Sequence, residues 1–232
     1  MTIEDQILFE DNHLIIFNKI SGQIVQADKT ETTPLIELLR NYLKIKHQKS
    51  GNVFLGIPHR IDRPTTGIVI FAKTSKALHR MIDMFKDRNI KKTYWAIVKN
   101  KPEIEKGRLE HYLKKNERNN KTSVFPHETP NAKKAILNYQ IMYSFDNYYL
   151  LNVDLETGRH HQIRAQLSFI GSPIKGDLKY NFDRPNQDRS ICLHARKIEF
   201  NHPVTKELMR FEAPVLTNEN IWKAIAEIEF SL

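Results

Sequence analysis

The chain has 232 residues, enough for one large domain or two small ones with a sizeable core. Its 36 Lys and Arg against 27 Asp and Glu give a formal net charge of +9, which favours a polyanionic partner. The single cysteine, Cys192, excludes an internal disulfide and a thiolate zinc cluster, and the sequence shows neither a signal peptide nor an apolar run of membrane-spanning length. We therefore expect a cytoplasmic protein without a membrane partner.

The first expected elements are two short strands and a helix. Apolar runs predict strands over residues 7–10 and 14–18, separated by a polar turn. Thr33 is expected to cap a helix that has Pro34 as its first residue and ends near residue 46. The apolar side chains of this helix recur at helical spacing: Leu35, Leu38, Leu39, Tyr42 and Leu43.

A polar loop with one carboxylate precedes the most apolar strand. Residues 68–72 are rich in β-branched side chains, which predicts a buried strand. In the loop before it, Asp62 lies between Arg60 and Arg63, and nearby cations favour the ionised form of a carboxylate. An ionised acid is suited to act as a base or a nucleophile, whereas the ordinary alternative is a surface salt bridge at a turn.

The middle of the chain continues with a helix and further strands. Ser75 is expected to cap a second amphipathic helix, and residues 90–98 predict a strand dense in aromatic and β-branched side chains. Residues 114–131 are polar and contain two prolines, which predicts a long loop. Strict alternation then predicts a half-exposed strand over 135–143, and a further strand is expected over 148–155.

A glycine turn is expected to join the last of these strands to a short helix. The segment TGRHHQIR at 157–164 contains the turn, and Ile163 and Leu167 indicate a helix that ends at Gly171. The rest of the chain predicts a loop, a hairpin and a final helix over 217–230.

Two adjacent histidines, His160 and His161, raise the question of a metal site. Ligands at consecutive helical positions point in different directions. The sequence also has no His-Glu-x-x-His or Cys-x-x-Cys motif that would complete such a site. We therefore predict that these histidines bind no metal ion.

Several segments resemble motifs of the RluA-type pseudouridine synthases. HRIDRPTTG at 59–67 is similar to the family pattern HRLDRxTSG, and Ile61 and Thr66 are mild departures from it. NKISG at 18–22 is similar to NKPxG, with Ile20 in place of the proline. The first of these motifs carries the catalytic aspartate of the family.

Two further motifs extend the resemblance over nearly the whole chain, in order. KTYWA at 92–96 is similar to the family pattern KxYxA. TGRHHQIR at 157–164 is similar to TGRxHQIR, with His160 in place of the usual Thr or Ser and with Ala165 and Gln166 in place of Val and His. Because each motif matches at several defined positions, the motifs together identify a family far more reliably than one short motif would.

The resemblance implies a fold and a domain organisation. The implied fold is the α+β pseudouridine synthase catalytic domain, a mixed, largely antiparallel sheet with flanking helices and a central active-site cleft. We expect residues 1–232 to form this single catalytic domain, to be monomeric, and to lack the N-terminal S4 domain that many relatives carry.

The resemblance also implies roles for five residues. Asp62 is the essential catalytic residue, acting on the ribose or on the base, and Arg164 pairs with its carboxylate through a forked, charge-assisted contact. Tyr94 lies against the target base and Ile163 is an apolar neighbour of that base. Arg60 fills the space that the target nucleotide vacates when it flips out of the RNA.

The implied reaction is the isomerisation of a uridine in RNA, in which the bond from ribose to N1 breaks and the ribose rejoins C5 of the uracil. No cofactor or metal is required. The RNA partner is a tRNA or an rRNA, and the sequence does not choose between them. The residues leave one alternative of another class, a non-catalytic RNA-binding protein on the same fold. A phosphotransferase is disfavoured, because HRID matches the kinase motif HRD only superficially and no Gly-rich phosphate loop accompanies it.

Overall fold

The computed structural model describes residues 1–27, 31–216 and 219–229. The strands in these residues are β1 (Ile7–Glu10), β2 (Leu14–Lys19), β3 (Thr66–Ala72), β4 (Lys91–Val98), β5 (Lys106–Asn116), β6 (Lys121–Phe125), β7 (Lys133–Ser144), β8 (Tyr149–Leu155), β9 (Leu193–Asn201) and β10 (Leu208–Glu212). The helices are α1 (Leu35–Lys46), α2 (Ser75–Lys86), α3 (Gln162–Phe169) and α4 (Asn220–Glu229), with short 3-10 helices at Glu4–Gln6 and Leu178–Tyr180.

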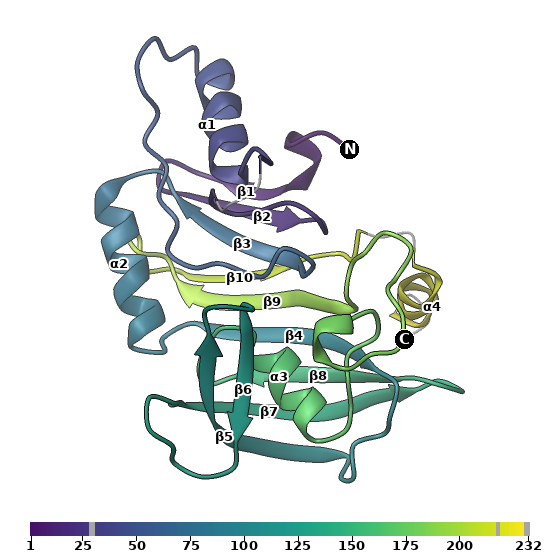
Figure 1. Ribbon diagram of the computed structural model, residues 1–232. Helices are drawn as coiled ribbons and strands as arrows, with labels where there is room; N and C mark the ends of the chain where they lie inside the picture. The colour runs from purple at the N-terminus through teal and green to yellow at the C-terminus, as the bar shows by residue number, and fades with distance from the viewer. Residues whose placement is uncertain (28–30, 217–218, 230–232) are drawn as a thin grey trace.

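All the strands of these residues join one sheet in the order β1-β2-β3-β9-β4-β8-β7-β5-β6, and β10 pairs with β9 (Figure 1). The pair β3 and β9 is parallel, and the other pairs in the described part of the chain are antiparallel. The helices flank this sheet. The structure therefore confirms a mixed, largely antiparallel α+β fold.

Strand β3 is buried along its whole length because a helix covers each of its faces. Val69 and Phe71 belong to the same core cluster as the apolar side of α1, whereas Ile68 and Ile70 belong to the cluster that contains the apolar side of α2. Successive side chains of a strand point to opposite faces, so a strand covered on both faces requires an unbroken apolar run. The apolar sequence of residues 68–72 meets this requirement.

The other half of the sheet packs around β4. Trp95 of β4 stacks on Trp222 of α4, with ring centroids 6.5 Å apart. Ile163 and Leu167 bring α3 into the same core, so the helix expected before Gly171 is present. The final helix is also present, while the positions 217, 218 and 230 that were expected in it lie outside the described residues.

The two halves of the sheet meet where β3 runs parallel to β9. Their ladder is short, because Thr66 pairs with His194 and Gly67 with Ala195. Gly67 has a φ of +104°, and a Cβ atom at this position would lie 2.6 Å from the backbone nitrogen of Ala195. Both the left-handed backbone and the close approach of the two strands therefore require glycine.

Replacing Gly67 by alanine is expected to lower the free energy of unfolding by about 3–5 kcal/mol, through backbone strain and overpacking against β9. Urea unfolding followed by circular dichroism measures this loss. Gly51→Ala is the matched control, because a Cβ atom at Gly51 would meet no atom within 4 Å. Equal unfolding midpoints for the two variants would contradict the role of Gly67 at the junction.

Two helices begin one residue away from where the sequence placed them. The N-cap of α1 is Pro34 rather than Thr33, because Pro34 is extended (φ −73°, ψ 152°) and the first helical N–H donates to the carbonyl of Ile24 at 2.8 Å. The N-cap of α2 is Thr74, whose Oγ1 accepts from the third residue beyond it, and Ser75 is the first helical residue. None of the helices in the described ranges is long and apolar enough to cross a membrane.

The expectation of a long loop over residues 114–131 is wrong, because most of this segment forms the hairpin of β5 and β6. In its turn, the side-chain oxygens of Asn116 and Asn119 each accept a backbone N–H two residues further on, at 3.0 Å. The N–H of Thr122 donates to the hydroxyl of Tyr180 at 2.8 Å, which attaches β6 to a distant segment. A polar, solvent-facing ribbon has little apolar pattern, so the sequence resembled that of a loop.

Candidate active site

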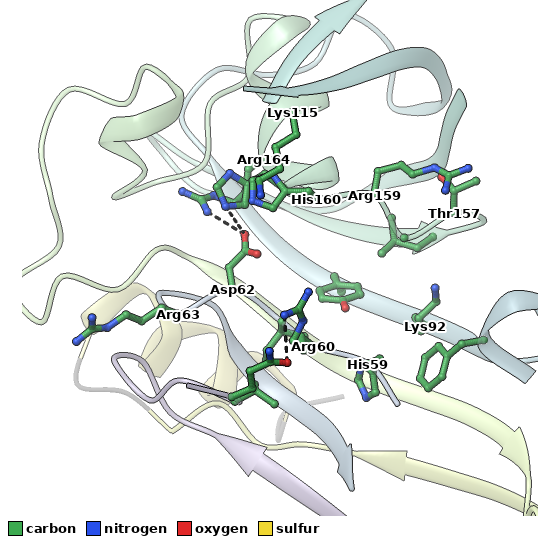
Figure 2. Close-up of a pocket in the computed structure, with 18 of the residues that line it drawn as sticks. His59, Arg60, Asp62, Arg63, Lys92, Lys115, Thr157, Arg159, His160 and Arg164 are labelled. Carbon is green, nitrogen blue, oxygen red and sulfur yellow. Dashed lines mark hydrogen bonds and ion pairs between the residues drawn. The ribbon is translucent and has the colours of Figure 1, made fainter. Parts of the chain in front are cut away.

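A cleft of about 1110 Å³ opens between the two halves of the sheet (Figure 2). One wall is the loop of residues 58–64, which precedes β3, and the opposite wall is the turn of residues 155–161 that leads into α3. Tyr94 of β4 also lines the cleft. The motifs HRIDRPTTG at 59–67 and TGRHHQIR at 157–164 thus face each other across one cavity.

The cleft is strongly basic. Its lining contains two carboxylates, Asp62 and Glu156, against nine cationic side chains. Lys and Arg from both walls share this lining: Arg60, Arg63, Lys86, Arg88, Lys92, Lys115, Arg159, Arg164 and Lys179. Because a cavity focuses the field of the charges around it, this cleft attracts polyanions.

A buried lysine holds the loop that carries Asp62. The ammonium of Lys19, at the end of β2, donates to the backbone carbonyls of Ile20, Gln23 and Arg63 at 3.0, 3.1 and 3.0 Å. Burial lowers the pKa of Lys19 to about 7. These bonds tie the loop at Arg63 to the segment after β2, so the Lys19 side chain fixes the backbone next to Asp62.

His59 attaches the same loop to β3. Its Nε2 accepts the N–H of Ile70 at 3.0 Å, and its ring stacks on Phe85 of α2 with centroids 4.5 Å apart. Burial lowers the pKa of His59 to about 3, so the imidazole is neutral and can accept a hydrogen bond at neutral pH. The histidine thereby provides an acceptor for a backbone N–H of β3 that lies past the two residues paired with β9.

Asp62, Arg164 and Asp177 form one ion-pair network. Nη1 of Arg164 donates to Oδ2 of Asp62 at 2.8 Å, so the two residues pair, but through a single hydrogen bond and not through the expected fork (Figure 2). The remaining edge of the guanidinium binds Asp177 in a forked manner, from Nε at 2.7 Å and from Nη2 at 2.9 Å. Burial opposes the charge of Arg164, but the hydrogen bonds to Asp177 and Asp62 outweigh burial and raise its pKa.

Exposure differs sharply between the two acids of this network. The side chain of Asp177 is 2% exposed and that of Arg164 is 5% exposed, whereas the side chain of Asp62 is 25% exposed. Asp177 is therefore a buried structural partner of the arginine, and Asp62 is the acid that a molecule in the cleft can reach.

The two adjacent histidines belong to the same wall. Their rings stack with centroids 3.7 Å apart, and Nε2 of His161 lies 3.7 Å from Oδ2 of Asp62. Nδ1 of His161 lies 2.9 Å from the hydroxyl of Tyr180, while Nδ1 of His160 lies 2.8 Å from Oγ1 of Thr122. Within the described residues, no three His, Cys, Asp or Glu side chains gather as a metal-binding group.

The other site residues expected from the sequence differ in their placement. Tyr94 and Arg60 line the cleft, and the Arg60 guanidinium donates to Oε1 of Gln26 at 3.2 Å. Burial raises the pKa of Tyr94, so its hydroxyl stays protonated at neutral pH. Ile163 is 4% exposed in the core and does not line the cleft in the described structure. Consecutive residues of a helix point about 100° apart, so Arg164 in the cleft turns Ile163 towards the core.

Sequence reasoning missed three residues of this site: Lys19, Asp177 and Tyr180. The segment with Asp177 was expected only to form a loop. One signal was available in the sequence GSPIKGD at 171–177, because glycine and proline favour a constrained turn before the acid, and Gly176 has a φ of +87° in the structure. Nothing in the local sequence indicated that the acid would meet Arg164.

Comparison with known proteins identifies the family. A family model described as RNA pseudouridylate synthase matches residues 13–169. An uncharacterized RNA pseudouridine synthase of Chlorobaculum parvum is 32% identical over 229 residues, which cover 90% of this chain and 70% of that protein. The ribosomal large subunit pseudouridine synthase C of Vibrio vulnificus is 31% identical over 235 residues, which cover 99% of this chain and 71% of that protein. The chain thus spans about 70% of the length of these relatives.

Two solved structures have the same fold. Human RNA pseudouridylate synthase domain containing 4 aligns with a TM-score of 0.79 and 24% identity, over 96% of this chain and 93% of that chain. Human RNA pseudouridylate synthase domain containing 1 aligns with a TM-score of 0.70 and 19% identity, over 95% and 94% of the two chains. Because the family match covers most of the sequence and the fold agrees, the chain belongs to the RNA pseudouridylate synthase family and is an RNA-modifying isomerase.

Proposed function

We propose that this chain converts uridine to pseudouridine in RNA with Asp62 as the essential carboxylate. In this reaction the bond between ribose C1′ and N1 breaks, a bond between C1′ and C5 forms, C5 loses its proton and N1 gains one. The observation that carries the proposal is the contact of Asp62 with Arg164 inside a basic cleft, where Asp62 is the exposed acid of the network.

The ion-pair network suits a carboxylate that must react. Arg164 is shared between two acids, so the three charges sum to −1 and the arginine does not fully neutralise Asp62. The fork to Asp177 fixes the guanidinium, which in turn fixes the orientation of the Asp62 carboxylate. A lysine in place of Arg164 would supply the charge but not the planar set of donors.

The target nucleotide has to leave the RNA stack to reach Asp62, and unstacking costs a few kcal/mol that protein contacts must offset. Tyr94 supplies an aromatic face and a protonated hydroxyl for the flipped base. Arg60, on the exposed side of the loop, leaves Gln26 and fills the vacated space in the RNA. The cationic lining of the cleft holds the flanking phosphates.

The names of the relatives support a choice of RNA class. Several of them are called ribosomal large subunit pseudouridine synthase C or D, so we propose ribosomal large-subunit RNA as the substrate. The single domain over residues 1–232, the monomeric state and the cytoplasmic location stay predictions.

Tritium release from RNA transcribed with 5-tritiated uridine tests the proposal directly, because the label must leave C5 when this carbon joins the ribose. The wild-type chain is expected to release tritium from large-subunit rRNA transcripts in preference to total tRNA. Asp62→Asn is expected to reduce the rate by at least about 10⁴-fold while binding the same RNA, because removal of a group that acts covalently or as the base abolishes its step.

The matched control is Asp146→Asn, which removes an exposed carboxylate in the turn between β7 and β8. This variant should release tritium at the wild-type rate. Tritium release by Asp62→Asn at the wild-type rate would refute the role of Asp62. Release from tRNA alone would keep the reaction and replace the proposed substrate.

A further inference from the structure

Two side-chain nitrogens of the site face the same oxygen of Asp62. Arg164 donates to Oδ2 at 2.8 Å, and Nε2 of His161 lies 3.7 Å from that same Oδ2. The second distance is slightly beyond a hydrogen bond. Catalytic contacts of a free enzyme are often long and shorten when substrate binds, so a small shift of the carboxylate would complete this one.

A chain of hydrogen bonds determines which nitrogen of His161 carries the proton. The N–H of Thr122 donates to the Tyr180 oxygen at 2.8 Å, so this oxygen already accepts. The single hydrogen of the Tyr180 hydroxyl is then available for Nδ1 of His161, 2.9 Å away. With Nδ1 accepting, the proton of a neutral imidazole resides on Nε2, which is the nitrogen that faces Asp62.

The ring of His161 has little freedom to move. The side chain is buried, its backbone has the left-handed φ of 51°, and its ring stacks on that of His160. His160 is itself held by Thr122, whose hydroxyl donates to the His160 carbonyl at 3.0 Å and lies 2.8 Å from Nδ1 of the same histidine. The direction of the Nε2–H bond is therefore set by the fold.

We propose that His161 is a positioning residue that, together with Arg164, anchors Oδ2 of Asp62, so that Oδ1 is the oxygen that acts on the target uridine. The inference rests on the proposed role of Asp62. It assigns different tasks to the two carboxylate oxygens, one bound by protein donors and the other turned to the substrate.

A neutral donor suits this task better than a charged one. A second full positive charge beside Asp62 would weaken the carboxylate as a base and as a nucleophile, whereas a neutral N–H orients it with a smaller electrostatic effect. Burial lowers the pKa of His161 to about 3, so the imidazole remains neutral at neutral pH.

The protonation of His161 can be measured without any RNA. Long-range proton–nitrogen correlation spectra of the chain labelled with ¹⁵N-histidine distinguish a protonated from an unprotonated ring nitrogen, and loss of one signal set in His161→Gln assigns the residue. We expect the proton on Nε2 in the wild type and a mixture of tautomers in Tyr180→Phe, which removes the hydroxyl but keeps the ring beside Arg164. A wild-type His161 that is protonated on Nδ1, or on both nitrogens, would overturn the inference.

Two variants separate the contact with Asp62 from the contact with Tyr180. The amide oxygen of His161→Asn is placed to accept from Tyr180, but this shorter side chain does not reach Asp62. His161→Gln places an N–H near the position of Nε2. We expect His161→Asn to lower kcat for tritium release by about 10- to 100-fold with little change in KM, and His161→Gln to restore most of the rate.

The control is His127→Gln, which alters an exposed histidine after β6 and should keep the wild-type rate. If Asp62→Asn is inactive and His161→Asn has the wild-type kcat, the inference fails and the proposed function stands. If Asp62→Asn is as active as the wild type, the proposed function fails and the assignment of the oxygens fails with it. Should His161→Asn not fold, the rate of His161→Gln and the wild-type tautomer decide the question.

Discussion

Replacing Arg164 by methionine is expected to lower the free energy of unfolding by about 3–5 kcal/mol, because it leaves the Asp177 carboxylate buried without its cation. The same substitution removes the partner of Asp62, so tritium release from rRNA should fall by at least about 10³-fold. Urea unfolding and the tritium assay measure the two losses separately.

The double variant Arg164→Met, Asp177→Leu distinguishes the structural from the catalytic task of the arginine. Replacing both members of a buried ion pair by apolar residues is often nearly neutral, so we expect the unfolding free energy to return to within about 1 kcal/mol of the wild type. Activity should stay lost, because the charge-assisted hydrogen bond that Arg164 donates to Asp62 is still absent. Recovery of activity in the stable double variant would show that Arg164 acts only through stability.

The central ion pair of the candidate site could be predicted from the sequence because both of its residues lie in contiguous motifs. Asp62 and Arg164 were both found in this way, and the structure places them 2.8 Å apart. Asp177 was not found, because its burial and its contact with Arg164 depend on how the loop before Leu178–Tyr180 folds over α3. A motif identifies a residue type at a position, but the partner of a buried charge is set by tertiary packing.

The pattern of apolar residues predicted a strand well where at least one face of the strand is buried, and poorly where both faces are exposed. The buried strand β3 has an unbroken apolar sequence, and the half-exposed β7 alternates. The ends of the hairpin β5 and β6 carry runs of Lys, Asn and Glu, and its attachment through Thr122 to Tyr180 lies outside any local window. The sequence pattern therefore could not show that this segment is ordered, although Thr122 also fixes the hydroxyl that orients His161.

The cleft follows from the short junction between the two halves of the sheet. Beyond Thr66 and Gly67 the parallel pairing of β3 with β9 stops, and the loop that carries Asp62 runs along the free edge of β3 instead. Gly56 exchanges two backbone hydrogen bonds with Ala72 at the far end of this edge. The loop thus lies along the part of β3 that β9 does not cover, and His59 and Lys19 hold the loop there through hydrogen bonds.

The chain is expected to lose stability at pH values well above those at which carboxylates protonate, because the fold keeps three histidines neutral. Burial lowers the pKa of His59 and of His161 to about 3 and that of His194 to about 4. In the unfolded chain a histidine takes up its proton near pH 6.5, so between about pH 6.5 and pH 4 the unfolded state binds more protons than the folded state. Stability is therefore complete above this window and is lost as the pH falls through it, by about 6 kcal/mol between pH 7 and pH 5 for the three groups.

Urea unfolding at pH 7, 6 and 5 measures this dependence. The variant His59→Gln shows how much of the loss comes from His59. The glutamine oxygen can accept the Ile70 N–H but cannot titrate, so the loss between pH 7 and pH 5 should shrink by about one third, to about 4 kcal/mol. His127→Gln changes an exposed histidine and should leave the loss unchanged. Glu10 adds little to the loss between pH 7 and pH 5, because a glutamate of the unfolded chain takes up its proton only near pH 4.5 and the hydrogen bonds from Lys73, His47 and Lys46 overcome burial and lower the folded pKa of Glu10 to about 2. An unfolding free energy that is constant from pH 7 to pH 5 would mean that the three imidazoles are not held neutral, and the neutral donor assigned to His161 would lose its support.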